Sequence, residues 1–213
     1  MTLRIRMAQA GDEAGIALVS TLAFAPGKDA LTTNLFPARL QPETGDPAMT
    51  AYPWRLTRKA WWIREGEGIM MVAVDDALDG KIVGFSLWES PREPGTKGPK
   101  EPSVPCPGFD PEEYASFRDH METTIKGWFG EVGLSNMWYL DYLAVDPAHQ
   151  RRGLGKMLLQ WGLDKAQEEK RDAFLIATPA GKPLYSHMGF VAIHEVDLWG
   201  VEHLGMIKRH QEQ

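Results

Sequence analysis

Cysteine is nearly absent from this chain of 213 residues, which has one, Cys106. A single cysteine cannot close an internal disulfide, so we expect an intracellular protein of a reducing compartment, the cytoplasm. The Cys and His residues also lack the spacing of a zinc site, so no metal is expected. Cys106 lies in a proline-rich stretch without a neighbouring base, which argues against a nucleophilic cysteine.

Long apolar runs and an excess of positive charge are missing as well. No run is long enough to span a membrane, and the first residues lack the apolar core of a signal peptide. The chain has 23 Lys and Arg against 29 Asp and Glu, a net charge of -6, which argues against nucleic acid as a partner. With 43% hydrophobic residues, the composition fits one globular domain, or a domain with a long insertion.

Alternating apolar residues and turn residues predict strands and helices in alternation along most of the chain. Residues 26–50 lack periodicity and are predicted to be mostly loop. The predicted strands are 3–8, 69–74, 82–88, 137–145, 173–177, 190–198 and 204–207. Helices are predicted as well: one that begins after Asp12, one over 54–63, one that begins near Gly155, and one over 182–188.

A proline-rich segment interrupts this pattern. Seven prolines fall between Pro91 and Pro111, and because proline fixes φ and lacks an N–H donor, the segment is predicted to be an extended loop. Asp110-Pro111-Glu112-Glu113 then has the composition of a helix N-terminus, and the helix is expected to reach residue 127 or 130. We interpret 91–136 as an insertion between two strands of one sheet.

The most informative segment is the run from Tyr139 to Gly155. Its apolar strand stops at Asp146-Pro147, and Gln-Arg-Arg-Gly-Leu-Gly then opens an amphipathic helix. The first N–H groups of a helix lack intrahelical partners and lie at the positive end of its dipole, so they attract anions. Glycine at 153 and 155 removes Cβ atoms that would obstruct a phosphate. The segment therefore predicts a phosphate-bearing ligand.

The spacing of the glycines narrows the choice of ligand. A P-loop requires Lys-Ser or Lys-Thr after its last glycine, and Lys156 is followed by Met157. The dinucleotide motif requires a third glycine where Leu158 stands. The motif Gln-x-x-Gly-x-Gly after a strand resembles the acyl-CoA signature of the GNAT superfamily of N-acetyltransferases. Leu-Tyr-Ser-His-Met-Gly-Phe at 184–190 is similar to a second segment of that family.

The resemblance implies an α/β fold with a mixed central sheet flanked by helices. The resemblance is most specific over 137–190, faint over the first strand, the first helix and the strand at 82–85, and absent over roughly 27–66 and 90–136. We expect one domain, 1–213, with the 91–136 insertion lying over the acceptor side as a lid. The resemblance also implies acetyl-CoA as cosubstrate, with its pyrophosphate on the turn and its pantetheine beside a bulged strand end at Leu143-Ala144-Val145. The N–H near Leu143 would polarise the thioester oxygen. The remaining cofactor-binding candidates are Gln150, Arg151, Arg152, Gly153, Leu154, Gly155, Lys156, Thr178, where the family has asparagine, and Ser186.

Two side chains are candidates for the chemistry. Tyr185 stands where the family often has a tyrosine that protonates the leaving thiolate, and a phenol is protonated at neutral pH. Asp141 interrupts an apolar strand, and a buried carboxylate is costly unless paired. It is therefore a candidate base or acceptor contact, or a structural ion-pair partner. The family often has glutamate at the position of Tyr139, so Glu89, at the end of another strand, remains a further candidate base.

These observations predict an acetyl-CoA-dependent N-acetyltransferase that transfers acetyl directly to a primary amine of a small molecule or protein. The alternative is a non-catalytic acyl-CoA sensor or protein-interaction module with the same fold. Neither a membrane nor nucleic acid is an expected partner. A monomer or a homodimer is expected, and the apolar C-terminal strand is a candidate for pairing across a dimer.

Overall fold

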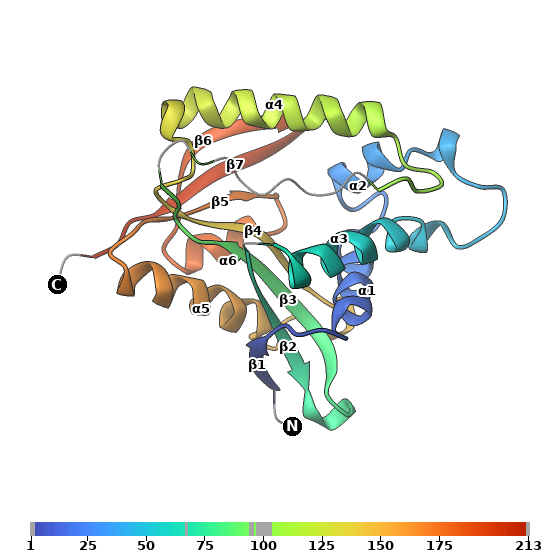
Figure 1. Ribbon diagram of the computed structural model, residues 1–213, viewed down its shortest axis with the longest axis horizontal. Helices are drawn as coiled ribbons and strands as arrows, with labels where there is room; N and C mark the ends of the chain where they lie inside the picture. Colours follow the sequence, from blue (N-terminus) through green and yellow to red (C-terminus); the bar gives the residue numbers. More distant parts are fainter. Residues whose placement is uncertain (1–2, 67, 94–95, 97–103, 212–213) are drawn as a thin grey trace.

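The computed structural model describes residues 3–66, 68–93, 96 and 104–211. Within these ranges a central sheet of seven strands has the order β1-β2-β3-β4-β5-β7-β6, with helices on both faces (Figure 1). Neighbouring strands are antiparallel except for the parallel pair β4 and β5, so the predicted mixed α/β sheet is confirmed. The strands are β1 Leu3–Met7, β2 Ile69–Asp75, β3 Lys81–Glu89, β4 Trp138–Val145, β5 Ala173–Ala177, β6 Val191–Leu198 and β7 Val201–Lys208.

The alternation of side chains along β2 shows how the two faces of the sheet are buried. Met70, Val72 and Val74 pack with residues of α1 and α3, whereas Met71 and Ala73 pack with residues of α5. One face is therefore covered by α1, α3 and α4, and the other by α5 and α6. The helices are α1 Glu13–Ala23, α2 Ala30–Leu35, α3 Tyr52–Arg64, α4 Pro111–Phe129, α5 Leu154–Glu168 and α6 Lys182–His187.

The prediction of a mostly irregular segment over residues 26–50 was wrong in part, because it contains the short helix α2. Asp29 caps this helix, since its carboxylate accepts hydrogen bonds from the backbone N and the hydroxyl of Thr32, both at 2.7 Å. Leu35 and Phe36 then pack with Trp54 of α3 in a small apolar cluster. A single capped turn is too short to produce helical periodicity in the sequence.

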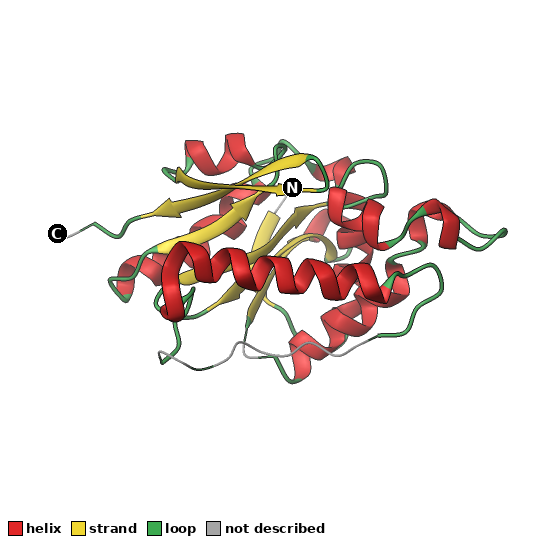
Figure 2. Cartoon of the chain, turned by 90° about the horizontal axis from the view of Figure 1, so that it is seen from above, coloured by secondary structure: helices red, strands yellow, loops and turns green. Residues whose placement is uncertain are grey.

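The end of the insertion forms α4, which begins where the sequence predicts. The Asp110 carboxylate accepts a hydrogen bond from the Glu113 backbone N at 3.1 Å, and Gly130 follows the last helical residue. Helix α4 crosses the strands on the face that it shares with α1 and α3 (Figure 2). Phe117 stacks on Trp199 at 5.4 Å, and Phe129 meets Phe174 at 5.0 Å. Prolines 94, 99 and 102 of the predicted loop lie outside the described residues.

The C-terminal strand β7 lies inside the sheet. It pairs with β5 through Phe174 and Ile207, and with β6 through Val196 and His203. Both of its edges are therefore hydrogen-bonded within the chain, and the expectation that this strand pairs across a dimer was wrong. Among the described residues no helix is long and apolar enough to cross a membrane.

Candidate active site

The turn between β4 and α5 leaves the first backbone N–H groups of the helix without a side-chain cap from any residue that the structure describes. Gly153, the N-cap residue, has φ +81°, a left-handed conformation in which glycine is the least strained residue. No side chain of the described residues caps α5, and the Met157 backbone N bonds to the Gly153 carbonyl at 3.1 Å. The N–H groups of residues 154–156 therefore precede the intrahelical ladder, as in an anion-binding helix N-terminus.

The side chains of this turn have different roles. Arg152 donates to the Asp75 carboxylate at 3.0 Å, and the Gln150 side-chain amide donates to the Val145 carbonyl at 3.3 Å. Both side chains thus tie the turn to the end of the sheet. Leu154 is buried in the core, whereas Arg151 and Lys156 are exposed beside the helix start. Of the groups in this turn that were predicted to contact the pyrophosphate, the side chains of Arg151 and Lys156 and the backbone N–H groups face solvent.

Helix α6 packs directly against the first turn of α5. A Cβ added at Gly155 would lie 3.1 Å from Cδ2 of Leu184, so the close approach favours glycine. The next residue, Tyr185, is buried beside Phe190, and burial raises the pKa of its phenol. The phenol is therefore protonated at neutral pH and able to donate.

The two other residues predicted on this side lie at either end of α6. The Thr178 hydroxyl accepts from the Gly181 backbone N at 3.2 Å, and Ser186 is exposed. Thr178 therefore supports the turn that precedes the helix, while Ser186 faces solvent near its last turn.

Strands β4 and β5 separate just before the turn. They pair only through residues 138–140 of β4, so the β5-facing edge of β4 lies outside the ladder from Asp141 onward. The pairing of β4 with β3 shifts at the same place, because Leu87 pairs with Tyr142 and Trp88 with Leu140. Asp141 is thus the extra residue of a β-bulge, two positions before the predicted segment 143–145.

A cluster of charged groups surrounds this bulge on the face covered by α3 and α4. The Lys59 ammonium lies 3.5 Å from the centroid of the Tyr142 ring and 5.1 Å from that of Phe85, and its residue is 2% exposed. Burial lowers the pKa of Lys59, and the charge of Asp141 opposes that shift. Burial raises the pKa of half-buried Asp141, against the attraction of Lys59 and two arginines, Arg58 and Arg118.

Glu89, the last residue of β3, has the most unusual carboxyl group of the site. Its side chain is 17% exposed and forms an ion pair with Arg92. Burial, followed by the negative charge of Asp141, raises the pKa of Glu89 to about 7, although Arg92 acts in the opposite direction. A carboxyl group with this pKa is partly ionised at neutral pH and is able to accept a proton there.

Tyr139 connects these groups. It pairs with Glu89 across the β3–β4 ladder, and its ring stacks on Phe174 at 6.3 Å. Burial, and then the charges of Asp141 and Glu89, raise the pKa of its phenol, with a smaller influence of Tyr185. The two predicted residues Asp141 and Tyr185, together with Glu89, thus all act electrostatically on Tyr139.

A cavity of about 350 Å³ opens beside Glu89. Glu89 and Tyr139 line it from the sheet, Arg92 lines it from the segment after β3, and Glu122, Ile125 and Lys126 line it from α4. The insertion therefore supplies one wall of the space next to the carboxyl group with the raised pKa. Among the described residues no group of three or more His, Cys, Asp or Glu side chains is placed to hold a metal ion.

The family model of the GNAT acetyltransferases matches residues 36–190, which include both sides of this site. The chain belongs to the GNAT family. The match covers the turn, the bulged strand and α6, so the features that carried the resemblance in the sequence lie inside the family's core.

Individual relatives of this GNAT protein are distant. A protein of the fungus Stachybotrys chartarum described as an acetyltransferase is 28% identical over 63% of this chain, and the match spans 60% of that protein. The structure of a histone acetyltransferase HPA2 and related acetyltransferase from Corynebacterium glutamicum has a TM-score of 0.61 at 23% identity and covers 100% of this chain and 99% of that one. PaiA N-acetyltransferase of Thermoplasma acidophilum, solved in complex with coenzyme A, has a TM-score of 0.55 at 13% identity, over 99% of this chain and 100% of that one. At these identities the solved structures show the fold alone.

Proposed function

We propose that the protein is an acetyl-CoA-dependent N-acetyltransferase that transfers acetyl directly to a primary amine of a small molecule or protein. One observation carries the proposal. Glu89, with a pKa of about 7, pairs with Tyr139 close to where β4 leaves the ladder with β5, and Tyr185, a buried protonated phenol, belongs to the helix that packs on the uncapped start of α5. The site thus has a proton acceptor, a proton donor and an anion-binding turn.

The donor side fits a nucleotide-bearing thioester. The pyrophosphate of acetyl-CoA would accept hydrogen bonds from the N–H groups at residues 154–156, with Arg151 and Lys156 beside it. The free edge of β4 at residues 143–145 offers backbone groups for the pantetheine amides. The coenzyme A complex of the Thermoplasma relative supports this choice of donor.

The acceptor side must remove a proton, because an ordinary alkyl amine with a pKa near ~10.4 arrives charged. Glu89 faces the cavity beside α4 and accepts that proton in its ionised form. Asp141 acts on Glu89 through its charge, which helps to keep the pKa of Glu89 close to neutral. This assigns Asp141 a positioning role and makes Glu89 the base.

The proton transfers balance. Acetyl-CoA supplies the acetyl group, whose carbonyl carbon forms the new C–N bond as the C–S bond breaks. Glu89 receives the proton that the ammonium loses before attack, and the nitrogen releases its second proton to solvent as the amide forms. Tyr185 gives its proton to the departing sulfur, so the products are an amide, a free thiol and one proton in solvent. Solvent then returns the proton from Glu89 to Tyr185.

The test is the release of free CoA thiol from acetyl-CoA across a panel of alkylamines, arylalkylamines, polyamines and peptides with a free N-terminus or lysine. Turnover with at least one class that is lost in Glu89→Gln supports the proposal. Tight donor binding without thiol release from any amine would instead favour the sensor alternative.

A further inference from the structure

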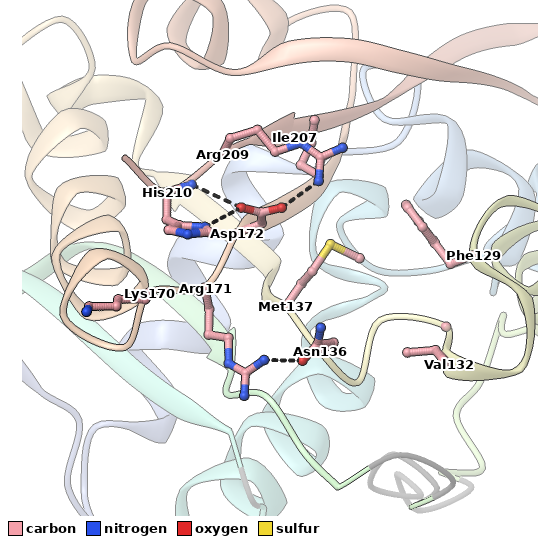
Figure 3. A pocket seen from close by; sticks show the side chains of 11 residues that line it. Phe129, Val132, Asn136, Met137, Lys170, Arg171, Asp172, Ile207, Arg209 and His210 are labelled. Atoms are coloured by element: carbon pink, nitrogen blue, oxygen red, sulfur yellow. Dashed lines mark hydrogen bonds and ion pairs between the residues drawn. The ribbon is translucent and has the colours of Figure 1, made fainter. Parts of the chain in front are cut away.

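A second cavity lies where β4 and β5 begin, at the end of these strands that is far from the α5 turn (Figure 3). It encloses about 410 Å³, within the range of small-molecule sites. It shares Gly133 and Met137 with the cavity beside Glu89. It contains none of the groups assigned to acetyl transfer. The proposed binding sites of acetyl-CoA and of the amine therefore leave this cavity without an assigned ligand.

One wall of this second cavity is apolar. Phe129 ends α4, Val132 lies in the turn that follows, Met137 precedes β4, and Ile207 belongs to β7. Val132 is 46% exposed although it is aliphatic. Four segments thus present hydrocarbon surface to one space, which favours a ligand with a compact apolar body.

The opposite wall is basic. Lys170 and Arg171 follow α5, and Arg209 and His210 follow β7. Asp172 is the single carboxylate of the lining, and it already accepts from Arg209 at 2.6 Å and from the His210 backbone N at 3.0 Å. Three cationic side chains therefore oppose one carboxylate, in a protein whose net charge is -6.

Contacts inside the lining orient the two arginine side chains, Arg171 and Arg209. Arg171 forms a hydrogen bond with the Asn136 side chain, and Lys170 has a left-handed backbone with φ +55°. In Figure 3 Arg171 lies beside Asn136, and Arg209 and His210 converge on Asp172. Guanidinium groups oriented in this way favour a planar oxyanion such as a carboxylate.

We propose that this cavity binds a small organic carboxylate, with the carboxylate at Lys170 and Arg171 and an aryl or short alkyl body against Val132 and Met137. An organic anion of this kind matches both walls, whereas an inorganic anion leaves the apolar wall in contact with water and a neutral hydrocarbon gains no attraction from the cations. The site is separate from the α5 turn, so its occupation does not require the proposed acetyl transfer.

The experiment is a titration of the full chain with phenylacetate, followed by backbone amide NMR, with phenylacetamide as the neutral probe of the same shape. We expect saturable shifts at residues of the cavity, about tenfold weaker binding in Arg171→Gln, and weaker binding in Val132→Ser. Arg64→Gln, an exposed arginine at the end of α3, is the matched control and should bind as the wild type does.

Three results would overturn the proposal. If phenylacetamide binds as tightly as phenylacetate, the charge of the ligand plays no part in binding. If Arg171→Gln binds phenylacetate as the wild type does, the carboxylate does not bind at Arg171. Displacement of phenylacetate by saturating acetyl-CoA, with shifts at residues 151–156, would place the anion on the α5 turn instead. Because none of these results depends on turnover, failure here and failure of the acetyltransferase proposal are distinguishable.

Discussion

The two sides of the candidate active site are built in different ways. On the α5 side, the anion-binding groups are backbone N–H groups held by a short turn and by two glycines, Gly153 and Gly155. On the side of α3 and α4, the charged groups are side chains that come from separate elements, such as Lys59, Glu89 and Asp141. A turn of six residues specifies the first side, whereas only the folded chain assembles the second.

This difference has a functional consequence. A backbone site binds phosphates without regard to the rest of the ligand, so it suits a donor that is common to a whole family. A side-chain site that includes a wall from an insertion is free to vary, so it suits an acceptor that differs from one member to the next. The predictions below separate the two sides, beginning with the largest expected effect.

The largest effect should come from the proposed base. Glu89→Gln keeps the shape of the side chain but removes proton acceptance, and we expect kcat to fall by about 10²–10³-fold with donor affinity unchanged. In the wild type kcat/KM should rise with pH through about 7, because the ionised carboxyl group is the active form. The rise should be absent in Glu89→Gln.

Glu93→Gln is the matched control, because Glu93 is an exposed carboxylate only a few residues away. It should retain both the rate and the pH profile. If the wild-type pH profile persists in Glu89→Gln, another group is the base, and Asp141 is the next candidate.

The second effect tests the donor side of the chemistry. Tyr185→Phe removes the phenol that protonates the leaving sulfur, and we expect kcat to fall by about 10²-fold while the Kd for acetyl-CoA stays within about twofold. Tyr52→Phe, at the start of α3, serves as control. Equal loss of donor affinity and rate in Tyr185→Phe would indicate a binding role for the phenol.

The third effect is on stability. The pKa of Glu89 is raised in the folded chain above its ordinary value of 4.5 to about 7, so the folded state holds the proton more tightly than the unfolded state. The wild type should therefore lose stability as the pH rises from about 4.5 to 7, by about 3 kcal/mol more than Glu89→Gln does. Urea unfolding at pH 4.5 and pH 8 measures this difference, and parallel curves for the two proteins would contradict the raised pKa.

The smallest effect concerns the wall supplied by the insertion. Ile125→Trp adds volume on the cavity side of α4 and should raise the KM for the acceptor about fivefold, with donor affinity unchanged. Thr123→Trp, on the exposed side of the same helix, should leave both constants unchanged. An unchanged acceptor KM in Ile125→Trp would remove α4 from the acceptor site.

The sequence predicted the α5 side better than the α3 and α4 side for a physical reason. Glycine spacing and the Asp146-Pro147 stop act within a few residues, so they are visible in one linear segment. The positions of β7 inside the sheet and of the bulge at Asp141 depend on pairing between distant strands. Neither has a local pattern that reveals it.

The same reason explains the residues that the sequence missed. Lys59 stands among the aromatic residues of an ordinary amphipathic helix, and its burial against Tyr142 and Phe85 follows from how α3 meets the sheet. Glu89 was a candidate only because it ends a strand, and its raised pKa follows first from burial and then from the charge of Asp141 on a neighbouring strand. A lone carboxylate in an apolar strand, Asp141, was the one local indication that charge is concentrated here.

The most direct test of the account is the calorimetric titration of acetyl-CoA into three proteins: wild type, Gly153→Glu and Gly200→Glu. The two glycines have similar left-handed backbones, with φ +81° and +77°, and both lie in open space, but only Gly153 adjoins the α5 N-terminus. The account predicts micromolar binding in the wild type and in Gly200→Glu, and its loss in Gly153→Glu. Absence of binding in the folded wild type, or equal binding in all three proteins, would contradict a coenzyme A site at this turn.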